Sequence, residues 1–335
     1  MAIQAKRSPK QILRLLVGIV IGAVFAFLAF RHVDWSQTGR AIASANMGWI
    51  AIGILSLAID YCLRIVRWRM MLRAVSADVS FGEAAVPYLA SIGLNNVLPF
   101  RLGDVARAVG YCRYLRASTG QIVSTMIVER MLDLLSLLAI FFVMLQAVPA
   151  GSVSPAFVKT CTVFGSIAIF GLLALLLAPG MFERWAVRVA ENGKNEKLRK
   201  VAAWFAEFFK SLMLMRSAPL AASLVLLSFG AWIFEGGVFA SVAMALGHTS
   251  LGTAPWFALS TGTLGTLVPS TPGYVGTFDF FCILGFTAFG VTKQAASLMA
   301  LVIHTVLWVP LTLAGMVVFG LSGAKRLSAP VGESA

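Results

Sequence analysis

The chain has 335 residues, of which 59% are hydrophobic and only 12% are charged, and its formal net charge is +13. This composition excludes an ordinary soluble protein, in which roughly a quarter of the residues are charged. Apolar stretches long enough to cross a bilayer occupy most of these residues and leave no room among them for a sizeable soluble catalytic domain. Beside such stretches, the positive charge indicates membrane topology and attraction to anionic lipids rather than nucleic-acid binding.

Six apolar spans are predicted as transmembrane helices, since about 20 helical residues cross the hydrocarbon core. In chain order they cover residues 13–30, 48–66, 122–148, 157–178, 219–246 and 294–320. The first span follows a basic segment and has no small-residue cleavage site, so we expect it to be retained rather than removed as a signal peptide. Two further apolar stretches, 81–118 and 253–291, are interrupted by Gly, Pro and polar residues. They are predicted to be broken or re-entrant helical hairpins.

The two interrupted stretches match each other 170 residues apart. Residues 80–120 laid over 250–290 without gaps share ten identities, Pro99 with Pro269 among them, where about three are expected by chance at average composition. Gly/Pro-interrupted segments at corresponding places in two halves of a membrane protein point to the binding site of a transporter.

The connections between the spans differ strongly in basic charge. Lys and Arg crowd residues 1–12, 67–80, 101–116, 181–216 and the tail after residue 322. The positive-inside rule places these segments, and with them both termini, in the cytoplasm. Each half then holds three spans, an odd number, so the second half must insert upside down. The predicted fold class is an all-α polytopic integral membrane protein with two inverted repeats, each of three spans and one broken or re-entrant hairpin (about 6–8 transmembrane helices).

This topology divides the chain into six segments with different expected roles. They are the basic N-terminus 1–12, the first membrane repeat 13–148, the fourth span 149–180 that opens the second repeat, the basic segment 181–216, the rest of the second repeat 217–322, and the cytoplasmic tail 323–335. The basic segment carries eight Lys and Arg against four Glu, with Trp and Phe between them. It predicts amphipathic helices on the cytoplasmic leaflet, with an ordinary solvated linker as the alternative.

The first interrupted stretch combines amide side chains with arginines. A break at membrane depth exposes backbone N–H and C=O groups, which Asn95 and Asn96 are suited to satisfy. A new helix beginning near Gly103 points its N-terminal N–H groups at the break, and with Arg101 and Arg107 it predicts a site for an anion such as a lipid phosphate. The alternative is that Arg101 only extends to the membrane interface.

Ionisable side chains inside a span are costly, so each is a candidate functional residue. The densest group lies in the third span, where Glu129 and Asp133 share a helix face and Arg130 is spaced to pair with Asp133. This cluster either neutralises itself and fixes the helix to its neighbours, or acts as a gating or coupling site whose partners change between states. Arg130 is also a candidate for phosphate binding.

The second interrupted stretch carries hydroxyls, glycines and prolines but no basic residue. Ser270 and Thr271 are candidates for binding a polar headgroup. The candidate hinge residues of the two breaks are Pro99, Gly103, Pro272, Gly273 and Gly276. Glu235 and Asp279 are lone acids in apolar sequence and candidate gating residues, and Glu235 is a candidate partner for an arginine of the other half. His304 is expected to be an interhelical hydrogen-bonding residue rather than a proton relay.

Arginines also end the second span. Arg64, Arg67 and Arg69 flank Trp68 there, and we expect them to extend to the interface as topology determinants. A role in substrate entry is the less favoured alternative.

Signatures of common enzyme classes are absent from the sequence. The three histidines are far apart and the four cysteines have no C-x-x-C spacing, so no metal site is expected. The sequence predicts no cofactor and no enzymatic activity.

Four motifs give the chain a resemblance to a known family. They read Arg64-x-x-Arg67-Trp68-Arg69, Asn96-x-x-Pro99-x-Arg101-x-Gly103-Asp104-x-x-Arg107, Glu129-Arg130-x-x-Asp133 and Pro272-Gly273-x-x-Gly276. Over about residues 13–320 the chain resembles the flippase-like transmembrane domain of bacterial lysylphosphatidylglycerol synthases, which standalone bacterial and archaeal proteins share. The resemblance implies lipid translocation between leaflets. Unlike the synthases, the chain is expected to lack a soluble aminoacyl-transferase domain, and it has Asp279 where the resemblance implies a Glu.

The predicted function is that of a flippase-like lipid translocase in the bacterial inner membrane. It would move an anionic phospholipid or a polyprenyl-phosphate-linked lipid between leaflets, with the phosphate held between the two breaks. One alternative is a membrane-embedded transferase for lipid-linked sugars, for which Glu129 and Asp133 are the candidate catalytic residues. Another is a non-transporting partner of a glycosyltransferase or other cell-envelope complex. Expected partners are membrane lipids, anionic ones above all, and an envelope-biosynthesis enzyme, but no nucleic acid.

Overall fold

The computed structural model describes residues 9–31, 33–75, 78–193, 195–214, 217–268 and 271–327. In those ranges the chain forms fourteen α-helices and two short 3-10 turns, and no strand. The predicted all-α class is confirmed. Of the candidate site residues, Ser270 lies outside the described residues.

Each of the six predicted spans coincides with a long helix. These helices are α1 (Pro9–Phe30), α3 (Met47–Val75), α7 (Thr119–Leu145), α8 (Pro155–Leu177), α11 (Ala218–Ala245) and α14 (Lys293–Leu327). In α3, α8, α11 and α14 the described residues include an apolar stretch long enough to cross a membrane. Helix α7 has a comparable length but carries Glu129, Arg130 and Asp133 in its middle.

The first interrupted stretch forms a helical hairpin, as predicted. Helix α4 (Phe81–Val97) and helix α5 (Leu102–Gly110) pack against each other, and the short helix α6 (Cys112–Leu115) follows. A capping box starts α4, in which the Ser80 hydroxyl accepts the Glu83 N–H and the Glu83 carboxylate accepts the Ser80 N–H. That backbone hydrogen bond lowers the pKa of the Glu83 carboxyl.

The break between α4 and α5 has a clear backbone cause. Pro99 has no N–H to continue the helix, and it begins a 3-10 turn, Pro99–Arg101. Phe100 and Arg101 adopt left-handed backbone angles, with φ of 62° and 51°. Such angles are uncommon for residues with a side chain, and they turn the chain back on itself within a few residues.

The second interrupted stretch is built in the same way. Helix α12 (Ala254–Gly265) packs against helix α13 (Thr277–Thr287), and a 3-10 turn, Pro272–Tyr274, lies between them. Gly273 and Gly276 have φ of 71° and 91°, which glycine adopts without strain. A side chain at Gly276 would also collide with α1, because its Cβ would lie 2.2 Å from a backbone oxygen of that helix.

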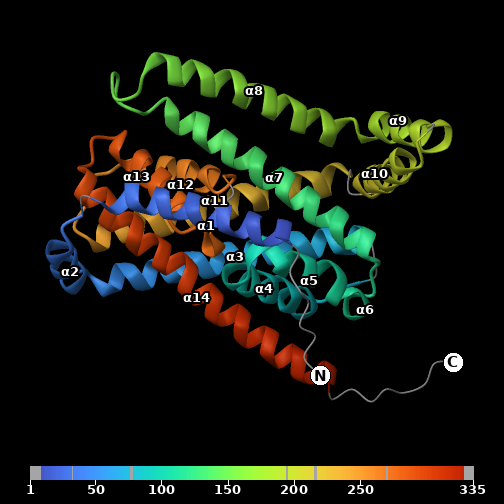
Figure 1. The fold of residues 1–335 in the computed structure, drawn as a ribbon, viewed down its shortest axis with the longest axis horizontal. Helices are drawn as coiled ribbons and strands as arrows, with labels where there is room; N and C mark the ends of the chain where they lie inside the picture. Colours follow the sequence, from blue (N-terminus) through green and yellow to red (C-terminus); the bar gives the residue numbers. More distant parts are fainter. Residues whose placement is uncertain are drawn as a thin grey trace.

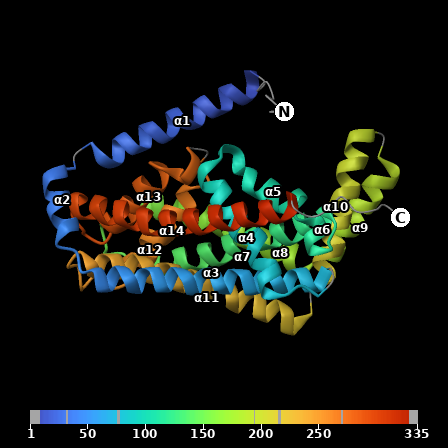
Figure 2. The same ribbon diagram turned by 90° about the horizontal axis from the view of Figure 1, so that it is seen from below.

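The two halves of the chain interlock (Figures 1 and 2). Helices α3 and α11 pack antiparallel, with the Ser56 hydroxyl donating to the Phe234 carbonyl at 2.6 Å near their middle. Each hairpin packs on the last long helix of the other half, α4 on α14 and α12 on α7. An antiparallel relation between corresponding helices is what an inverted repeat requires.

The elements outside the long helices gather at the two ends of the molecule. Helices α9 (Pro179–Asn192) and α10 (Glu196–Leu214) lie at the same end as α6, the start of α1 and the end of α14 (Figures 1 and 2). Phe208 and Phe209 of α10 are buried in the core, whereas Trp185 of α9 is exposed. The position of these helices on the cytoplasmic leaflet stays a prediction. The opposite end carries a helix that was not predicted, α2 (Trp35–Ala43), which Asp34 caps.

Candidate functional site

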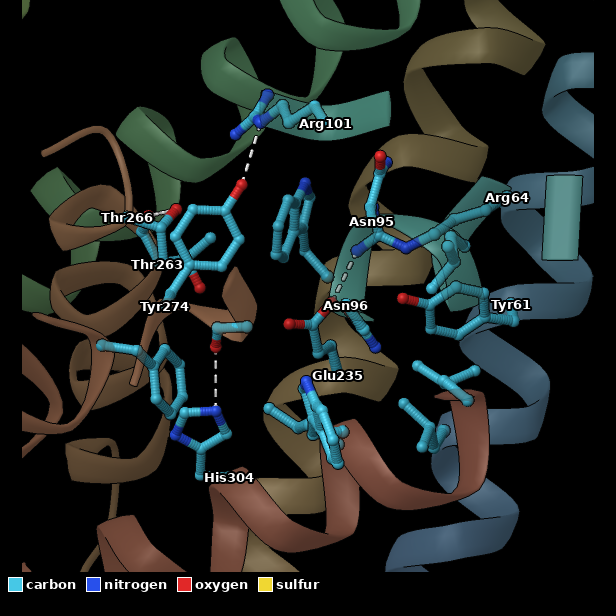
Figure 3. Close-up of a pocket in the computed structure, with 18 of the residues that line it drawn as sticks. Tyr61, Arg64, Asn95, Asn96, Arg101, Glu235, Thr263, Thr266, Tyr274 and His304 are labelled. Carbon is cyan, nitrogen blue, oxygen red and sulfur yellow. Dashed lines mark hydrogen bonds and ion pairs between the residues drawn. The ribbon is translucent and has the colours of Figure 1, made fainter. Parts of the chain in front are cut away.

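A cavity of about 250 Å³ lies between the two breaks. Its walls come from both halves of the chain. The first half contributes α3, α4, α7 and the first break, and the second half contributes α11, α12, α13, α14 and the second break. Figure 3 shows the labelled lining residues Tyr61, Arg64, Asn95, Asn96, Arg101, Glu235, Thr263, Thr266, Tyr274 and His304. The fold therefore brings the two interrupted stretches to one polar cavity, although they are 170 residues apart in the sequence.

Arg101 joins the two breaks. Its Nε donates a hydrogen bond of 2.8 Å to the hydroxyl of Tyr274, and its guanidinium carbon lies 5.7 Å from the centre of the Tyr274 ring. The side chain is exposed, and the left-handed backbone angle at Arg101 places it at the start of α5. The positive charge of Arg101 thus adds to that of the helix N-terminus, and both attract an anion.

Arg130 is the second cation available on this side of the cavity. It is half exposed, and its Nη2 lies 3.7 Å from the Asp104 carboxylate, beyond hydrogen-bond distance. Asp133 is spaced on the same helix to pair with Arg130, but its carboxylate lies 2.7 Å from Arg67 instead. The expected pairing of Arg130 with Asp133 inside the helix is therefore wrong.

An apolar groove of about 470 Å³ begins where the polar cavity ends. It lies between α5, α7 and α8, and Arg101 and Arg130 line both spaces. Its apolar lining residues are Val105, Ala108, Val123, Met126, Ile127, Met131, Leu134 and Leu172. The two arginines consequently mark the boundary between the cavity, whose lining is partly polar, and a more apolar groove.

The two asparagines satisfy the first break and tie it to its surroundings. The Asn95 amide donates to the Asp104 carboxylate at 2.8 Å and its carbonyl accepts the Asp104 N–H, which joins α4 to α5. The Asn96 amide donates to the Thr312 hydroxyl of α14 at 2.9 Å. Gly103 allows this close approach, because a Cβ there would lie 2.0 Å from the Ser91 carbonyl oxygen.

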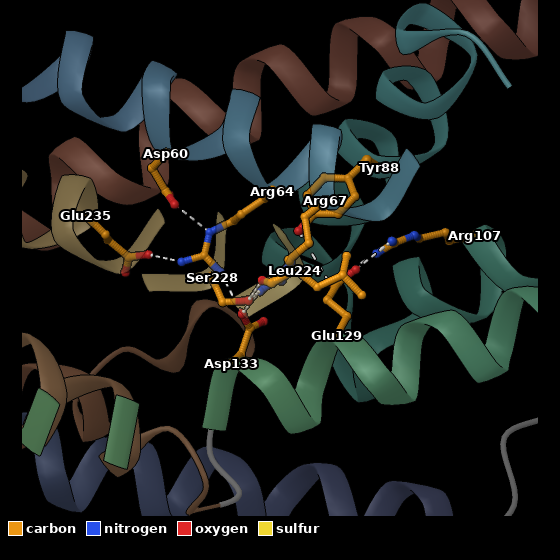
Figure 4. A network of polar contacts seen from close by, with 10 residues as sticks. All are labelled: Asp60, Arg64, Arg67, Tyr88, Arg107, Glu129, Asp133, Leu224, Ser228 and Glu235. Atoms are coloured by element: carbon orange, nitrogen blue, oxygen red, sulfur yellow. Dashed lines mark hydrogen bonds and ion pairs between the residues drawn. The ribbon is translucent and has the colours of Figure 1, made fainter. Parts of the chain in front are cut away.

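A buried ion-pair network connects the halves behind the cavity (Figure 4). Arg64 lies 2.6 Å from Asp60 and 2.7 Å from Glu235, and its guanidinium carbon is 4.3 Å from the Trp232 ring centre. The predicted partnership of Glu235 with an arginine of the other half is confirmed. The expectation that Arg64 and Arg67 extend to the interface is wrong, since both are buried and face carboxylates.

Arg107 belongs to this network and not to the cavity lining. It pairs with Glu129 at 2.8 Å and lies between two aromatic rings, 3.7 Å from the Trp68 ring centre and 4.3 Å from that of Tyr88. With 2% of its surface exposed, it is held where a phosphate cannot reach it without displacing Glu129. Its expected role as a phosphate ligand is not supported by this position.

The second break is held by α14. His304 contacts the Asp279 carboxylate at 2.9 Å and the Gly273 carbonyl at 3.0 Å, and Asp279 also accepts the Gly276 N–H. Thr271 bonds the Val275 carbonyl within the turn. Pro272, like Pro99 in the first break, begins a 3-10 turn, so both lie where a hinge was predicted.

The indole N–H groups of Trp232 and Trp308 are buried without a protein hydrogen-bond partner among the described residues. Both side chains line the cavity. Buried donors without a partner are costly, so these two N–H groups are candidates for bonding a ligand.

Six predicted residues thus line the cavity: Asn95, Asn96, Arg101, Arg130, Glu235 and Gly273. Glu129 and Asp133 lie in the ion-pair network, and Asp279 reaches the cavity only through His304. The prediction missed Arg64, His304, Tyr274 and the two tryptophans as lining residues. Arg64 and His304 carried a signal, because both are ionisable residues within apolar spans.

The comparison with known sequences decides the family. The family described as "Lysylphosphatidylglycerol synthase TM region" matches residues 15–315. The chain belongs to this family. It is therefore a polytopic, all-helical membrane protein, as the resemblance in its motifs implied.

Relatives of this family member include archaeal proteins. The chain is 27% identical over 355 aligned residues to "Glycosyltransferase AglD" of Haloferax volcanii, covering 95% of this chain but only 56% of the relative's length. It is 25% identical to a "UPF0104 membrane protein" of Methanothermobacter thermautotrophicus, covering 83% and 87% of the two chains. It is 23% identical to the UPF0104 membrane protein MJ1078 of Methanocaldococcus jannaschii, covering 72% and 98%.

Proposed function

We propose that this protein translocates an anionic lipid between membrane leaflets. The observation that carries the proposal is the position of Arg101 and Arg130 at the boundary between a cavity that contains many polar groups and a more apolar groove. An amphiphile with a phosphate between headgroup and chains has the same order of parts. The phosphate would bind the two arginines, the headgroup would enter the cavity, and a chain would follow the groove.

The chemistry of the cavity supports a headgroup rich in hydroxyls. Its polar lining includes amides, the hydroxyls of Thr263 and Thr266, and the two unpartnered indole N–H groups. Sugar headgroups and glycerol present the matching donors and acceptors. The family description, which names a phospholipid synthase, and the name of AglD, a glycosyltransferase, favour phospholipids and lipid-linked sugars as the two substrate classes to test.

Translocation is measured on purified protein in liposomes that contain a fluorescent lipid, by quenching the dye in the outer leaflet. Arg101→Gln combined with Arg130→Gln is expected to slow an anionic lipid at least about tenfold, since each charged hydrogen bond contributes about 1.5–3 kcal/mol. Arg113→Gln, on the exposed surface of α6, is the matched control and is expected to have no effect. Unchanged transport in the double variant, or equal transport of a zwitterionic lipid, would contradict the proposed site.

The orientation in the membrane is part of the proposal. The end that carries α6, α9 and α10 is rich in Lys and Arg, and we place it in the cytoplasm of the inner membrane. In intact cells, a membrane-impermeant maleimide should label Gln37→Cys on α2 and not Arg113→Cys on α6. Permeabilised cells, in which both should react, are the control. The reverse pattern would invert the topology.

The second candidate is a membrane-embedded transferase, which the similarity to AglD favours. In that case the catalytic carboxylate would have to face the cavity. Glu129 and Asp133 are held in ion pairs with Arg107 and Arg67, whereas Glu235 lines the cavity. Product formed by purified protein from a lipid-linked sugar donor, and lost in Glu235→Gln, would favour this alternative over translocation.

A further inference from the structure

His304 makes two hydrogen-bond contacts, and together they determine how many protons the His304–Asp279 pair carries. Its Nε2 lies 3.0 Å from the Gly273 carbonyl oxygen and its Nδ1 lies 2.9 Å from an oxygen of the Asp279 carboxylate. A backbone carbonyl has no proton to donate, so Nε2 must carry one. A second proton must lie between Nδ1 and the carboxylate, whichever of the two atoms it is bonded to. The pair is therefore neutral in this conformation, as imidazolium with carboxylate or as imidazole with carboxylic acid.

The conformation depends on that second proton. If this proton is released to water in the cavity, the pair has a charge of −1. A single proton then remains for the two contacts of His304, with Asp279 and with Gly273. Either the Nδ1 lone pair then faces the Asp279 carboxylate, or the Nε2 lone pair faces the Gly273 carbonyl. One of the two attractive contacts becomes a repulsion at hydrogen-bond distance. The deprotonated pair therefore favours a different arrangement.

These two contacts hold the second break against α14. Gly273 and Tyr274 both have left-handed backbone angles in the 3-10 turn, and the Asp279 oxygen that does not face His304 accepts the N–H of Gly276. Asp279 is 2% exposed, whereas the His304 side chain is 14% exposed and lines the cavity. The proton can therefore exchange with water in the cavity, at the position where His304 of α14 contacts the second break (Figure 3).

The other titratable and charged groups near the pair, Cys282 apart, have partners of their own. In the second break, Tyr274 accepts a hydrogen bond from Arg101. On α11, Glu235 is paired with Arg64 of α3. Cys282, one turn beyond Asp279 on α13, is a buried thiol. Helices α4 and α12 contribute amide and hydroxyl groups to this side of the cavity, and the described part of α1 packs on α13 through Phe25.

We propose that His304 and Asp279 form a proton-binding site whose occupancy locks the second break to α14, so that opening of the break is coupled to proton release. The coupling of protons to lipid movement rests on the proposed function; the lock itself does not. Below the titration range of the pair the break is held, and above it the break is free to move. Because one proton is released, the ratio of open to held molecules changes by up to about tenfold per pH unit within that range.

The test measures the distance between spin labels at Val275→Cys in the break and Val317→Cys on α14, both exposed positions. The protein is the full chain in liposomes, with Cys62, Cys112 and Cys161 replaced by Ser, between about pH 5 and pH 9. The wild-type pair is expected to give one narrow distance in acid and a second population in base. Asp279→Asn keeps every hydrogen bond without the extra proton, because its amide donates to Nδ1 and its carbonyl accepts the Gly276 N–H. This variant should stay held at all pH values.

His304→Ala should have the opposite effect and populate the second distance even in acid, while His248→Gln, outside the cavity, should behave like the wild type. A distance that does not respond to pH in the wild-type background, or an Asp279→Asn variant whose distance changes with pH like the wild type, would contradict the proposed proton site.

The outcome for the proposed function is read separately. A pH-dependent distance without lipid movement refutes the translocase and leaves the proton site standing, whereas lipid movement without a pH-dependent distance refutes the proton site alone.

Discussion

Replacing Arg67 by methionine is expected to lower the free energy of unfolding by about 3–5 kcal/mol. The Arg67 side chain is fully buried, and its Nη1 lies 2.7 Å from both the Asp133 carboxylate and the Ser228 hydroxyl. Without it, the Asp133 carboxylate keeps only the longer contact of 3.5 Å to Arg64. A buried carboxylate that loses its main partner costs far more than the lost attraction, because its desolvation is no longer offset.

The measurement is unfolding of the purified protein in mixed micelles by increasing amounts of a denaturing detergent. Arg73→Met is the matched control on the same helix, since Arg73 is half exposed, pairs with the exposed Asp78 and should contribute at most about 1 kcal/mol. Combining Arg67→Met with Asp133→Leu should recover most of the loss, because both charges then leave the core together. Equal effects of Arg67→Met and Arg73→Met would show that the network is not a stabilising core.

Alanine at Gly93 or Gly315 is expected to push α4 away from α14 and to lower the free energy of unfolding. A Cβ at Gly93 would lie 2.7 Å from the backbone of Gly315, and one at Gly315 would lie 2.4 Å from the Leu89 carbonyl oxygen. The atoms in the way belong to helix backbones, which cannot rotate aside as a side chain can. Overpacking of this kind costs about 1–3 kcal/mol, and more where a main chain must move.

Gly320→Ala, further along α14, is the control for the crossing. A Cβ there meets nothing within 4 Å, and alanine favours a helix over glycine by about 0.5–1 kcal/mol. It should therefore be neutral or stabilising in the same detergent titration. If the alanine variants at the crossing are as stable as Gly320→Ala, the two helices do not approach as closely as described.

The helices could be predicted from the sequence because length and apolarity are local properties. All six spans coincide with long helices, and both breaks lie where Pro and Gly interrupt apolar sequence. Helix α2 was missed because nine residues with a polar composition resemble an ordinary loop, although Asp34 followed by Trp35 is a usable helix start.

The partners of the buried charges could not be predicted in the same way. For Arg64, Arg67 and Arg107 the sequence offers several carboxylates as equally possible partners, and for Arg130 the spacing within its helix indicated Asp133. In the structure, contacts between helices decide instead, so Asp133 bonds Arg67 and Glu129 bonds Arg107. Glu235 was a candidate partner for an arginine of the other half, and the packing of α3 on α11 selects Arg64.

The different characters of the two breaks were partly visible in the sequence. Arginine and asparagine in the first break predicted an anion site, and Arg101, Asn95 and Asn96 do line the cavity. The contacts of His304 with the second break could not be predicted from the sequence, because its partners Asp279 and Gly273 are 25 and 31 residues away in the chain. Their meeting depends on how α13 folds back beside α14.

The exchange of hairpins between the halves decides which parts of the molecule can move as rigid bodies. Helix α4 is packed on α14 and helix α12 on α7. A rotation of the first 148 residues against the rest would therefore separate both of these helix crossings. A motion that keeps both crossings moves each hairpin together with the long helix of the other half, and it must also shift α13 along α14, because these two helices pack on each other. Alternation between two membrane-facing states would then be a relative motion of these hairpin–helix pairs, with α3 and α11 as the common axis and the two breaks as its joints.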